Sequence, residues 1–137
     1  MQVSPYLFFN GNCQEAFEYY QQLLGSEILA MLPHTGSPAA EQVPADFQEK
    51  IMHACMKIGD TMLMASDCPP DFVEKPQGFK VSLAVHDPAE AERIYDGLQE
   101  GAEIQMPLQE TFWAQRFAML IDRFGTPWMI NCGKPTE

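Results

Sequence analysis

Apolar positions along the chain follow first a strand-like and then a helical pattern. Val3 to Phe9 is rich in aromatic and branched residues, which predicts a strand. Cys13 to Leu24 carries apolar residues at helical spacing, and Gly25 is placed to end this helix in a left-handed turn. Asn12 is expected to cap the start of the helix, with Glu15 as its capping-box partner.

The same pattern returns in the second half of the chain. Phe79 to Val85 predicts a strand, Asp87-Pro88 opens a helix, and Gly101 ends it. The two helices align at a constant offset, with Asn12 opposite Asp87, Glu15-Ala16 opposite Glu90-Ala91, Tyr20 opposite Tyr95 and Leu23 opposite Leu98. This indicates an internal duplication. The alternative is that generic caps and apolar spacing make any two strand–helix units look alike.

Three further strands are expected after each helix. They are Glu27–Leu32, Ile51–Ile58 and Thr61–Ser66 in the first half, and Glu103–Pro107, Trp113–Asp122 and Trp128–Cys132 in the second. Gly59-Asp60 predicts a tight hairpin, and Phe124 to Pro127 predicts a turn. The proline-rich stretch from His34 to Gln48 predicts a long loop, and both His34 and His86 are expected to be solvated.

These elements predict one α+β domain over residues 1–137, built from two tandem βαβββ modules. Module one covers about 3–67 and module two about 79–133, joined by a proline-rich linker. Each mixed sheet would curl with its helix outside, so that the two modules form a cup suited to a small molecule.

Charge and composition exclude several classes of protein. The net charge of −11 disfavours a nucleic-acid partner. The chain has no apolar run long enough to span a membrane, and its first residues do not have the pattern of a signal peptide, so we expect a cytoplasmic protein. None of the 4 cysteines lies in a Cys-x-x-Cys pair, and we expect free, mostly buried thiols.

Three segments carry a resemblance to a known family. They are SPYLFFNGNCQEAFEYYQQLLG (Ser4–Gly25), IMHACMKIGDTMLMASD (Ile51–Asp67) and QETFWAQRFAMLIDRFGTPWMIN (Gln109–Asn131). With these segments the chain resembles the vicinal-oxygen-chelate superfamily, which includes glyoxalase I, bleomycin-resistance proteins and dioxygenases. Within it the chain is similar to the PhnB-like group, for which the Glu-Thr-Phe-Trp and Asp-x-Phe-Gly-x-Pro-Trp blocks are fairly specific. The resemblance implies the duplicated cup fold and a homodimer.

The resemblance also implies where a metal would be held. Catalytic members bind one divalent metal through His, Gln or Glu on the first and last strands of both modules. By strand alignment these positions are Pro5, Met64, Lys80 and Met129, and none offers a ligand for such a metal. A shift of one residue brings only Tyr6, Val81, Leu63 or Ala65, and Ile130 or Trp128. We therefore expect no metal ligands of the usual kind, and the sequence leaves any cofactor unknown.

His53 is the principal candidate for polar chemistry. If Gly59-Asp60 is a two-residue turn, Cys55 lies opposite Met64 and His53 opposite Ser66, and directly paired residues share one face of a sheet. His53 would then face the cup and act in acid–base chemistry near neutral pH. The alternative is that it hydrogen-bonds a backbone group or an acidic neighbour near the sheet edge. Cys55 would contact a ligand there, although a buried cysteine is more often a small apolar core residue.

The stretch from Glu110 to Gln115 is a second candidate site. Trp113 offers a flat apolar surface with one donor, Gln115 offers an amide, and Glu110 would assist His53. The alternative is a dimer contact, since aromatic residues and arginine are also favoured in interfaces. The predicted ligand-binding set is Cys55, Lys80, Trp113, Gln115, Trp128 and Asn131, with His53 and Glu110 as catalytic candidates.

Two functions fit these residues, and a third is weaker. The first is a PhnB-like protein that binds a small molecule in the cup without the usual metal site. The second is a glyoxalase- or dioxygenase-type enzyme with a displaced metal or an acid–base site around His53 and Glu110. A structural or regulatory role has only the lack of an evident active site in its favour. A nucleotide-type methyltransferase is disfavoured, because no two glycines form a Gly-x-Gly turn.

Overall fold

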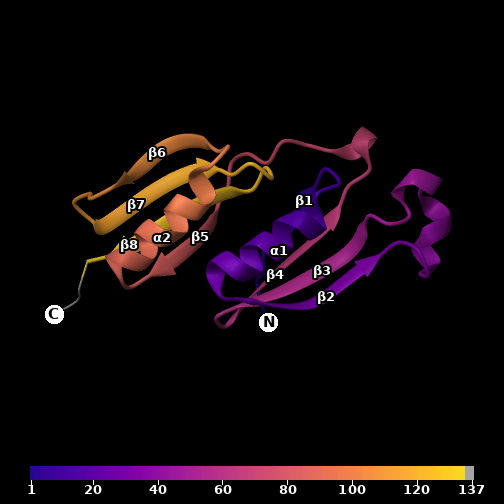
Figure 1. Ribbon diagram of the computed structural model, residues 1–137, viewed down its shortest axis with the longest axis horizontal. Coiled ribbons are helices and arrows are strands. Elements are labelled where there is room, and N and C mark those ends of the chain that lie inside the picture. The colour runs from indigo at the N-terminus through magenta and orange to yellow at the C-terminus, as the bar shows by residue number, and fades with distance from the viewer. Residues whose placement is uncertain (135–137) are drawn as a thin grey trace. The chain divides into compact units, whose positions relative to one another are not determined.

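The computed structural model describes residues 1–134, and the chain divides into two compact units (Figure 1). Unit 1 is Met1–Glu74 and unit 2 begins at Lys75. Among the described residues no helix is long and apolar enough to cross a membrane.

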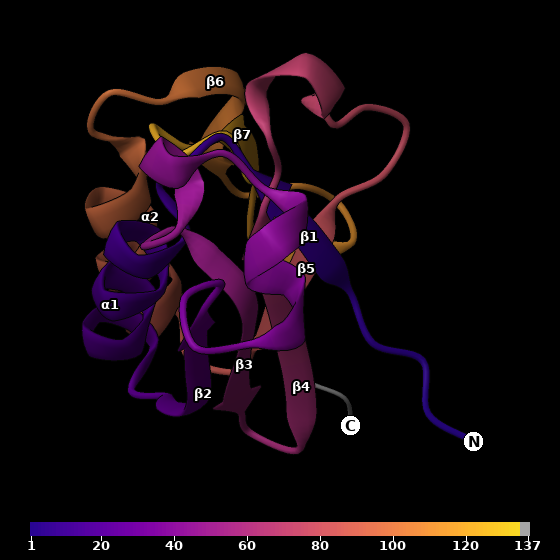
Figure 2. The same cartoon turned by 90° about the vertical axis from the view of Figure 1, so that its right-hand side faces the viewer.

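Unit 1 is a four-stranded sheet with one helix. Its elements are β1 (Tyr6–Phe9), α1 (Cys13–Leu24), β2 (Glu27–Pro33), β3 (Ile51–Ile58) and β4 (Thr61–Asp67). The strand order is β1-β4-β3-β2, with β1 parallel to β4 and the other pairs antiparallel. Figures 1 and 2 show α1 lying across one side of this sheet, which leaves the other side without a helix.

Unit 2 repeats the arrangement. Its elements are β5 (Val81–Val85), α2 (Pro88–Gln99), β6 (Glu103–Gln109), β7 (Ala114–Ile121) and β8 (Pro127–Gly133). The strand order β5-β8-β7-β6 again has one parallel pair, β5 with β8. The predicted α+β fold of two tandem βαβββ modules with mixed sheets is therefore confirmed. The shared cup stays a prediction.

The predicted long loop after β2 is more ordered than expected. It contains two short 3-10 helices, η1 (Pro38–Gln42) and η2 (Ala45–Phe47). The prediction that His34 is solvated is wrong, because its side chain is only 7% exposed. Its Nδ1 donates to the carbonyl oxygen of Lys50 at 2.9 Å, and its ring packs against Phe47. His86 is exposed, as predicted.

The two helices begin in different ways. Asp87 caps α2 as predicted, because its Oδ1 accepts the backbone N–H of Ala89 at 3.0 Å. The predicted cap by Asn12 is wrong, because its side chain makes no capping hydrogen bond. The Oδ1 of Asp67, at the end of β4, instead accepts the backbone N–H of Cys13 at 2.9 Å. Gly25 ends α1 with φ of 62°, the predicted left-handed turn.

The thiol of Cys13 makes alkaline stability sensitive to one side chain. Burial, with a further contribution from the Asp67 carboxylate, raises the pKa of Cys13 from 9.0 to about 12. The unfolded thiol loses its proton near pH 9 while the folded thiol keeps it, so stability is fully present below pH 9 and is lost as pH rises toward 12.

We therefore expect the free energy of unfolding at pH 10 to fall by about 1.4 kcal/mol more in the wild type than in Cys13→Ala. Urea titrations of both proteins at pH 7 and pH 10 measure this difference. Equal pH dependence in the two proteins would contradict it.

Candidate binding faces of the two sheets

The side of the unit 1 sheet away from α1, here called the open face of unit 1, carries the predicted site residues. In β3, Ala54 and Met56 are fully buried toward the helix, while His53 and Cys55 point the other way and are half-buried. The predicted pairing of Cys55 with Met64 is confirmed. Met64 also pairs with Tyr6 on β1, so Cys55, Met64 and Tyr6 share this face.

Tyr6 and His53 form a hydrogen-bonded aromatic pair on the open face of unit 1. The Tyr6 hydroxyl lies 3.2 Å from His53 Nδ1. Their ring centroids are 5.9 Å apart at an interplanar angle of 28°. The partner of His53 is thus a tyrosine hydroxyl, rather than the backbone group or acidic neighbour that the alternative expected. Its Nε2 has no hydrogen-bond partner among the described residues. Tyr6 was not among the predicted site residues, because the register of a parallel strand pair is not visible in sequence.

Apolar side chains surround the Tyr6–His53 pair. Phe8, two residues after Tyr6 on β1, is 63% exposed. Leu32, which pairs with His53 across the sheet, is 48% exposed. Contiguous exposed apolar surface around a few polar groups is typical of a binding surface.

Unit 2 presents a comparable open face, away from α2. Phe117 pairs with Asn131, and Met119 pairs with Met129, so these four side chains share this face. Leu120 pairs with Trp128, and both are buried on the opposite side of the sheet. The Oδ1 of Asn131 is buried and has no hydrogen-bond partner in the described part of the chain.

The Glu-Thr-Phe-Trp block forms the turn that leads into β7. The hydroxyl oxygen of Thr111 accepts the backbone N–H of Ala114 at 3.1 Å, and the Thr111 N–H donates to the Ala114 carbonyl. These bonds hold Phe112 and Trp113 at the tip, where they are 88% and 46% exposed. Trp113 also meets Phe117 edge-on, with centroids 5.3 Å apart.

Two other predicted residues, Gln115 and Lys80, have local partners in unit 2. The Nε2 of Gln115 donates to the carbonyl oxygen of Gly133 at 2.8 Å. Lys80 donates through Nζ to Oε1 of Gln105. Glu110 is exposed just after β6, and its cooperation with His53 of unit 1 stays a prediction.

Trp128, predicted to contact a ligand, is instead a core residue of unit 2. Its side chain is 0% exposed, and its indole N–H donates to Oδ2 of Asp122 at 2.8 Å. It pairs with Leu120 and Val81, which are also buried, so it lies on the helix-covered side of the sheet. The prediction rested on its place in the last strand, and a one-residue change of register moves a side chain to the opposite face.

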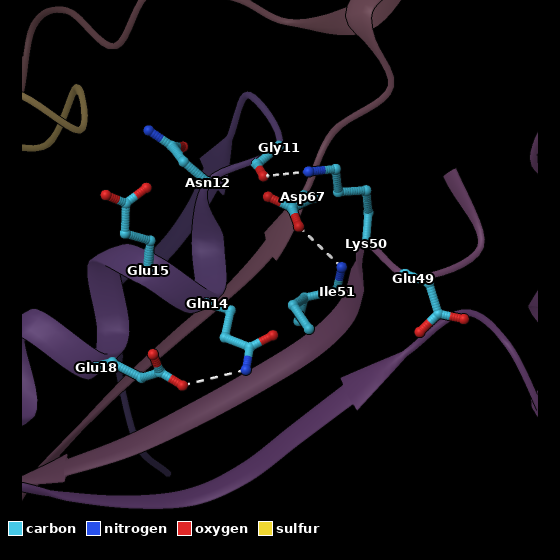
Figure 3. Close-up of a pocket in the computed structure, with 9 residues that line it drawn as sticks. All are labelled: Gly11, Asn12, Gln14, Glu15, Glu18, Glu49, Lys50, Ile51 and Asp67. Carbon is cyan, nitrogen blue, oxygen red and sulfur yellow. Dashed lines mark hydrogen bonds between the residues drawn. The ribbon is translucent and has the colours of Figure 1, made fainter. Parts of the chain in front are cut away.

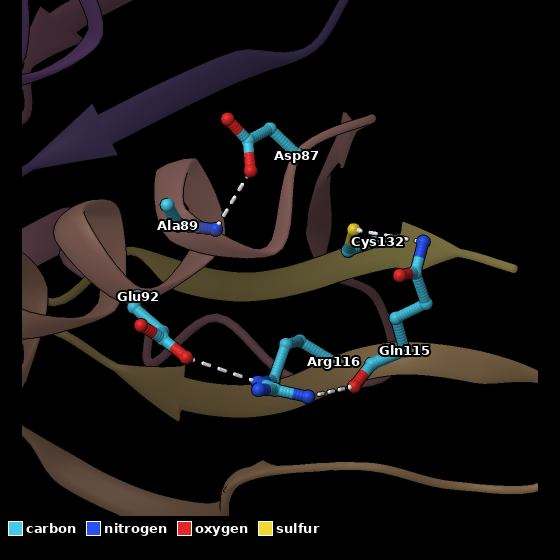
Figure 4. Close-up of polar contacts among 6 residues, drawn as sticks. All are labelled: Asp87, Ala89, Glu92, Gln115, Arg116 and Cys132. Atoms are coloured by element: carbon cyan, nitrogen blue, oxygen red, sulfur yellow. Dashed lines mark hydrogen bonds and ion pairs between the residues drawn. The ribbon is translucent and has the colours of Figure 1, made fainter.

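Arg116 also lies on the helix-covered side of unit 2. Its Nε donates to Oε1 of Glu92 on α2 at 3.2 Å, and Nη1 donates to the Gln115 carbonyl at 2.7 Å (Figure 4). Its charge is thus used to join β7 to α2.

The strand positions at which the resemblance implied metal ligands can now be located in the structure. Pro5 and Lys80 precede β1 and β5, so the open-face positions are Tyr6 and Ser82 instead. Strands β1, β4, β5 and β8 contain no His or Glu, and their one carboxylate, Asp67, accepts two backbone N–H groups. Within residues 1–134, no group of three or more His, Cys, Asp or Glu is placed to hold a metal ion.

A polar hollow of about 340 Å³ lies at the start of α1 (Figure 3). Lys50 crosses it to donate through Nζ to the Gly11 carbonyl oxygen at 2.9 Å, and the Oδ2 of Asp67 accepts the backbone N–H of Ile51 at 2.8 Å. The first contact ties the segment that enters β3 to the loop before the helix, and the second ties the beginning of β3 to the end of β4. The hollow therefore belongs to the framework of unit 1, on the side of the helix rather than the open face.

The sequence matches the family model of the Glyoxalase/Bleomycin resistance protein/Dioxygenase superfamily over residues 2–130. The chain belongs to this superfamily, as its three characteristic segments predicted. The structure of one FosX from Listeria monocytogenes, described as a fosfomycin resistance protein complexed with Mn(II) and a dihydroxypropylphosphonic acid, shares the fold with a TM-score of 0.67 at 10% identity over 98% of this chain and 93% of that one.

Two relatives are more similar in sequence. Protein YjdN of Escherichia coli K12 is 39% identical over 100% of both chains. Protein PA1353 of Pseudomonas aeruginosa is 50% identical over 98% of this chain and 99% of that one, with a TM-score of 0.88. A Bacillus cereus protein described as a putative 3-demethylubiquinone-9 3-methyltransferase, PhnB protein, shares the fold at 20% identity over 97% of this chain and 100% of that one, with a TM-score of 0.80.

Proposed function

We propose that this chain binds a small, largely apolar organic molecule on the open face of unit 1, anchored by Tyr6 and His53. The observation that carries the proposal is their 3.2 Å hydrogen bond amid exposed apolar side chains. A polar pair in an apolar surface orients a ligand through hydrogen bonds, while burial of the surrounding apolar surface contributes most of the binding free energy.

The names of the fold relatives do not transfer to this chain. The FosX structure contains a phosphonate, but this chain carries a net charge of −11, and its Arg116 is paired with Glu92. The B. cereus protein is described as a putative methyltransferase. The Gly-x-Gly turn that a methyltransferase of the common nucleotide-binding type needs is absent from this sequence. A neutral ligand fits the open face of unit 1 better than a dianion.

Loss of the Tyr6 hydroxyl is expected to weaken ligand binding about fivefold. The substitution removes the hydrogen bond that orients His53 for the ligand, and one hydrogen bond is worth about 1 kcal/mol. A panel of neutral aromatic and carbonyl fragments, followed by NMR shifts of the β1, β3 and β4 amides, would first find a binder. Its affinity is then compared between wild type and Tyr6→Phe.

The matched control for Tyr6→Phe is Phe72→Ala, since Phe72 is exposed on the linker outside the sheet. This control should leave the affinity unchanged. Fragment binding that maps only to the hollow beside α1, or an affinity insensitive to Tyr6→Phe, would contradict the proposed site.

The second candidate is an enzyme that uses the same pair for acid–base chemistry. It is favoured by the hydrogen bond between the Tyr6 hydroxyl and Nδ1, which fixes the orientation of the His53 ring. In the tautomer in which Nδ1 donates to the Tyr6 oxygen, Nε2 carries a lone pair that can take a proton from a bound molecule. Deuterium exchange of the α-protons of a bound carbonyl compound distinguishes the two functions. Exchange that is catalysed by wild type and lost in His53→Ala supports the enzyme, whereas binding without exchange supports the binding protein.

A further inference from the structure

Three sulfur-bearing side chains gather on the open face of unit 1. The Sγ of Cys55 lies 3.8 Å from the Sδ of Met62. Met64 is the direct cross-strand partner of Cys55, and Met62 is two residues away on the same side of β4. All three side chains are half-buried, and the Cys55 thiol is free. Neither proposed function uses this cluster.

The sulfur separation is suited to a shared metal ion. If each sulfur lies about 2.3 Å from the ion, as in metal–thiolate bonds, a separation of 3.8 Å gives an S–metal–S angle of about 110°. That angle lies between trigonal and tetrahedral coordination. The two ligands therefore need no large movement to bind one ion, and Met64, as the cross-strand partner of Cys55, is the candidate for the third sulfur.

The donor types select the ion. Thiolate and thioether sulfur are soft ligands, which prefer Cu(I) to Mg²⁺, Mn²⁺ or Ca²⁺. The neighbouring charge also favours a monovalent ion, because Lys57 pairs directly with Met62. Binding of Cu(I) releases the Cys55 proton, so one positive charge replaces another and the repulsion from the Lys57 ammonium hardly changes.

We propose that Cys55, Met62 and Met64 form a site for Cu(I) on the open face of unit 1. The ion forms a Cys55 Sγ–Cu bond as the S–H bond breaks and its proton passes to solvent. No oxidation or reduction occurs, and both thioethers bind through lone pairs. The site does not rest on the proposed binding of an organic molecule, although the two share one face of the sheet.

The test is an anaerobic titration of the full-length protein with Cu(I), using bicinchoninate as the competing chelator. The wild type is expected to withhold one Cu(I) ion per chain from the chelator. Cys55→Ser should abolish this binding. Met62→Leu, which keeps the apolar volume, should weaken it about tenfold or more, equivalent to at least 1.4 kcal/mol.

Cys68→Ser is the matched control, because Cys68 is half-buried but lies beyond the end of β4. Cys13 and Cys132 are fully buried. Binding that survives Cys55→Ser, or that is lost equally in Cys68→Ser, would overturn the proposal. So would Zn²⁺ binding as tightly as Cu(I). Far-ultraviolet circular dichroism shows whether each variant is folded, and if Cys55→Ser is not, Met62→Leu alone decides the outcome.

Discussion

Replacing Asp122 with alanine is expected to lower the free energy of unfolding by about 3–5 kcal/mol, because three buried donors lose their acceptor. The Oδ1 of Asp122 accepts the backbone N–H groups of Phe124 at 2.9 Å and Thr126 at 3.0 Å. Its Oδ2 accepts the indole N–H of Trp128 at 2.8 Å. Asp122, Thr126 and Trp128 are all buried, so water does not readily replace the lost acceptor.

Urea unfolding at pH 7 measures the effect of Asp122→Ala. The control is Asp60→Asn, in the corresponding β3–β4 turn of unit 1, where the carboxylate is exposed. We expect that control to change stability by less than about 0.5 kcal/mol. If Asp122→Ala were as mild as the control, the hydrogen bonds to Asp122 would contribute little to stability.

The Asp122 contacts give a structural role to the Asp-x-Phe-Gly-x-Pro-Trp block. The Asp-x-Phe-Gly-x-Pro-Trp block belongs to one of the segments that carry the resemblance to the superfamily. In the structure it builds the β7–β8 turn, with Gly125 at φ of 97° and Trp128 in the core. In the Glu-Thr-Phe-Trp block, Thr111 likewise stabilises a turn, because its hydroxyl oxygen accepts the backbone N–H of Ala114. The motifs therefore identify the fold more directly than they identify a ligand.

The sequence predicted those parts of the fold that depend on local chemistry. Gly59-Asp60 predicted a two-residue hairpin, and with it the pairing of Cys55 with Met64. The side-chain period of a strand then placed His53 on the same face as Cys55. Asp87 and Gly25 were likewise identified from the chemistry of helix ends.

Contacts between segments distant in sequence could not be predicted in this way. No turn links β1 to β4, so nothing local indicates that Tyr6 lies opposite Met64 and reaches His53. The burial of His34 depends on the Lys50 carbonyl and on Phe47 of the intervening loop. For Trp128, the position along the chain was known but the face of the strand was not.

The two similar modules use different residues to bind the free backbone N–H groups at the start of their helices. Each parallel strand pair ends beside the start of its helix, with Phe9 paired to Asp67 in unit 1 and Val85 paired to Cys132 in unit 2. The equivalent position is a carboxylate in one unit and a thiol in the other. Unit 1 uses this carboxylate at the start of α1, whereas unit 2 relies on Asp87 from the helix itself.

Asp67→Ala should therefore destabilise the protein by about 2–4 kcal/mol, because the buried N–H groups of Cys13 and Ile51 both lose their acceptor. The matched variant in unit 2, Asp87→Ala, removes an exposed cap and should cost only about 1 kcal/mol. Urea unfolding compares the two, with amide hydrogen exchange at Cys13 and Ile51 as a local readout. Equal losses in the two variants would mean that the helices start alike, and that Asp67 does not replace the missing Asn12 cap.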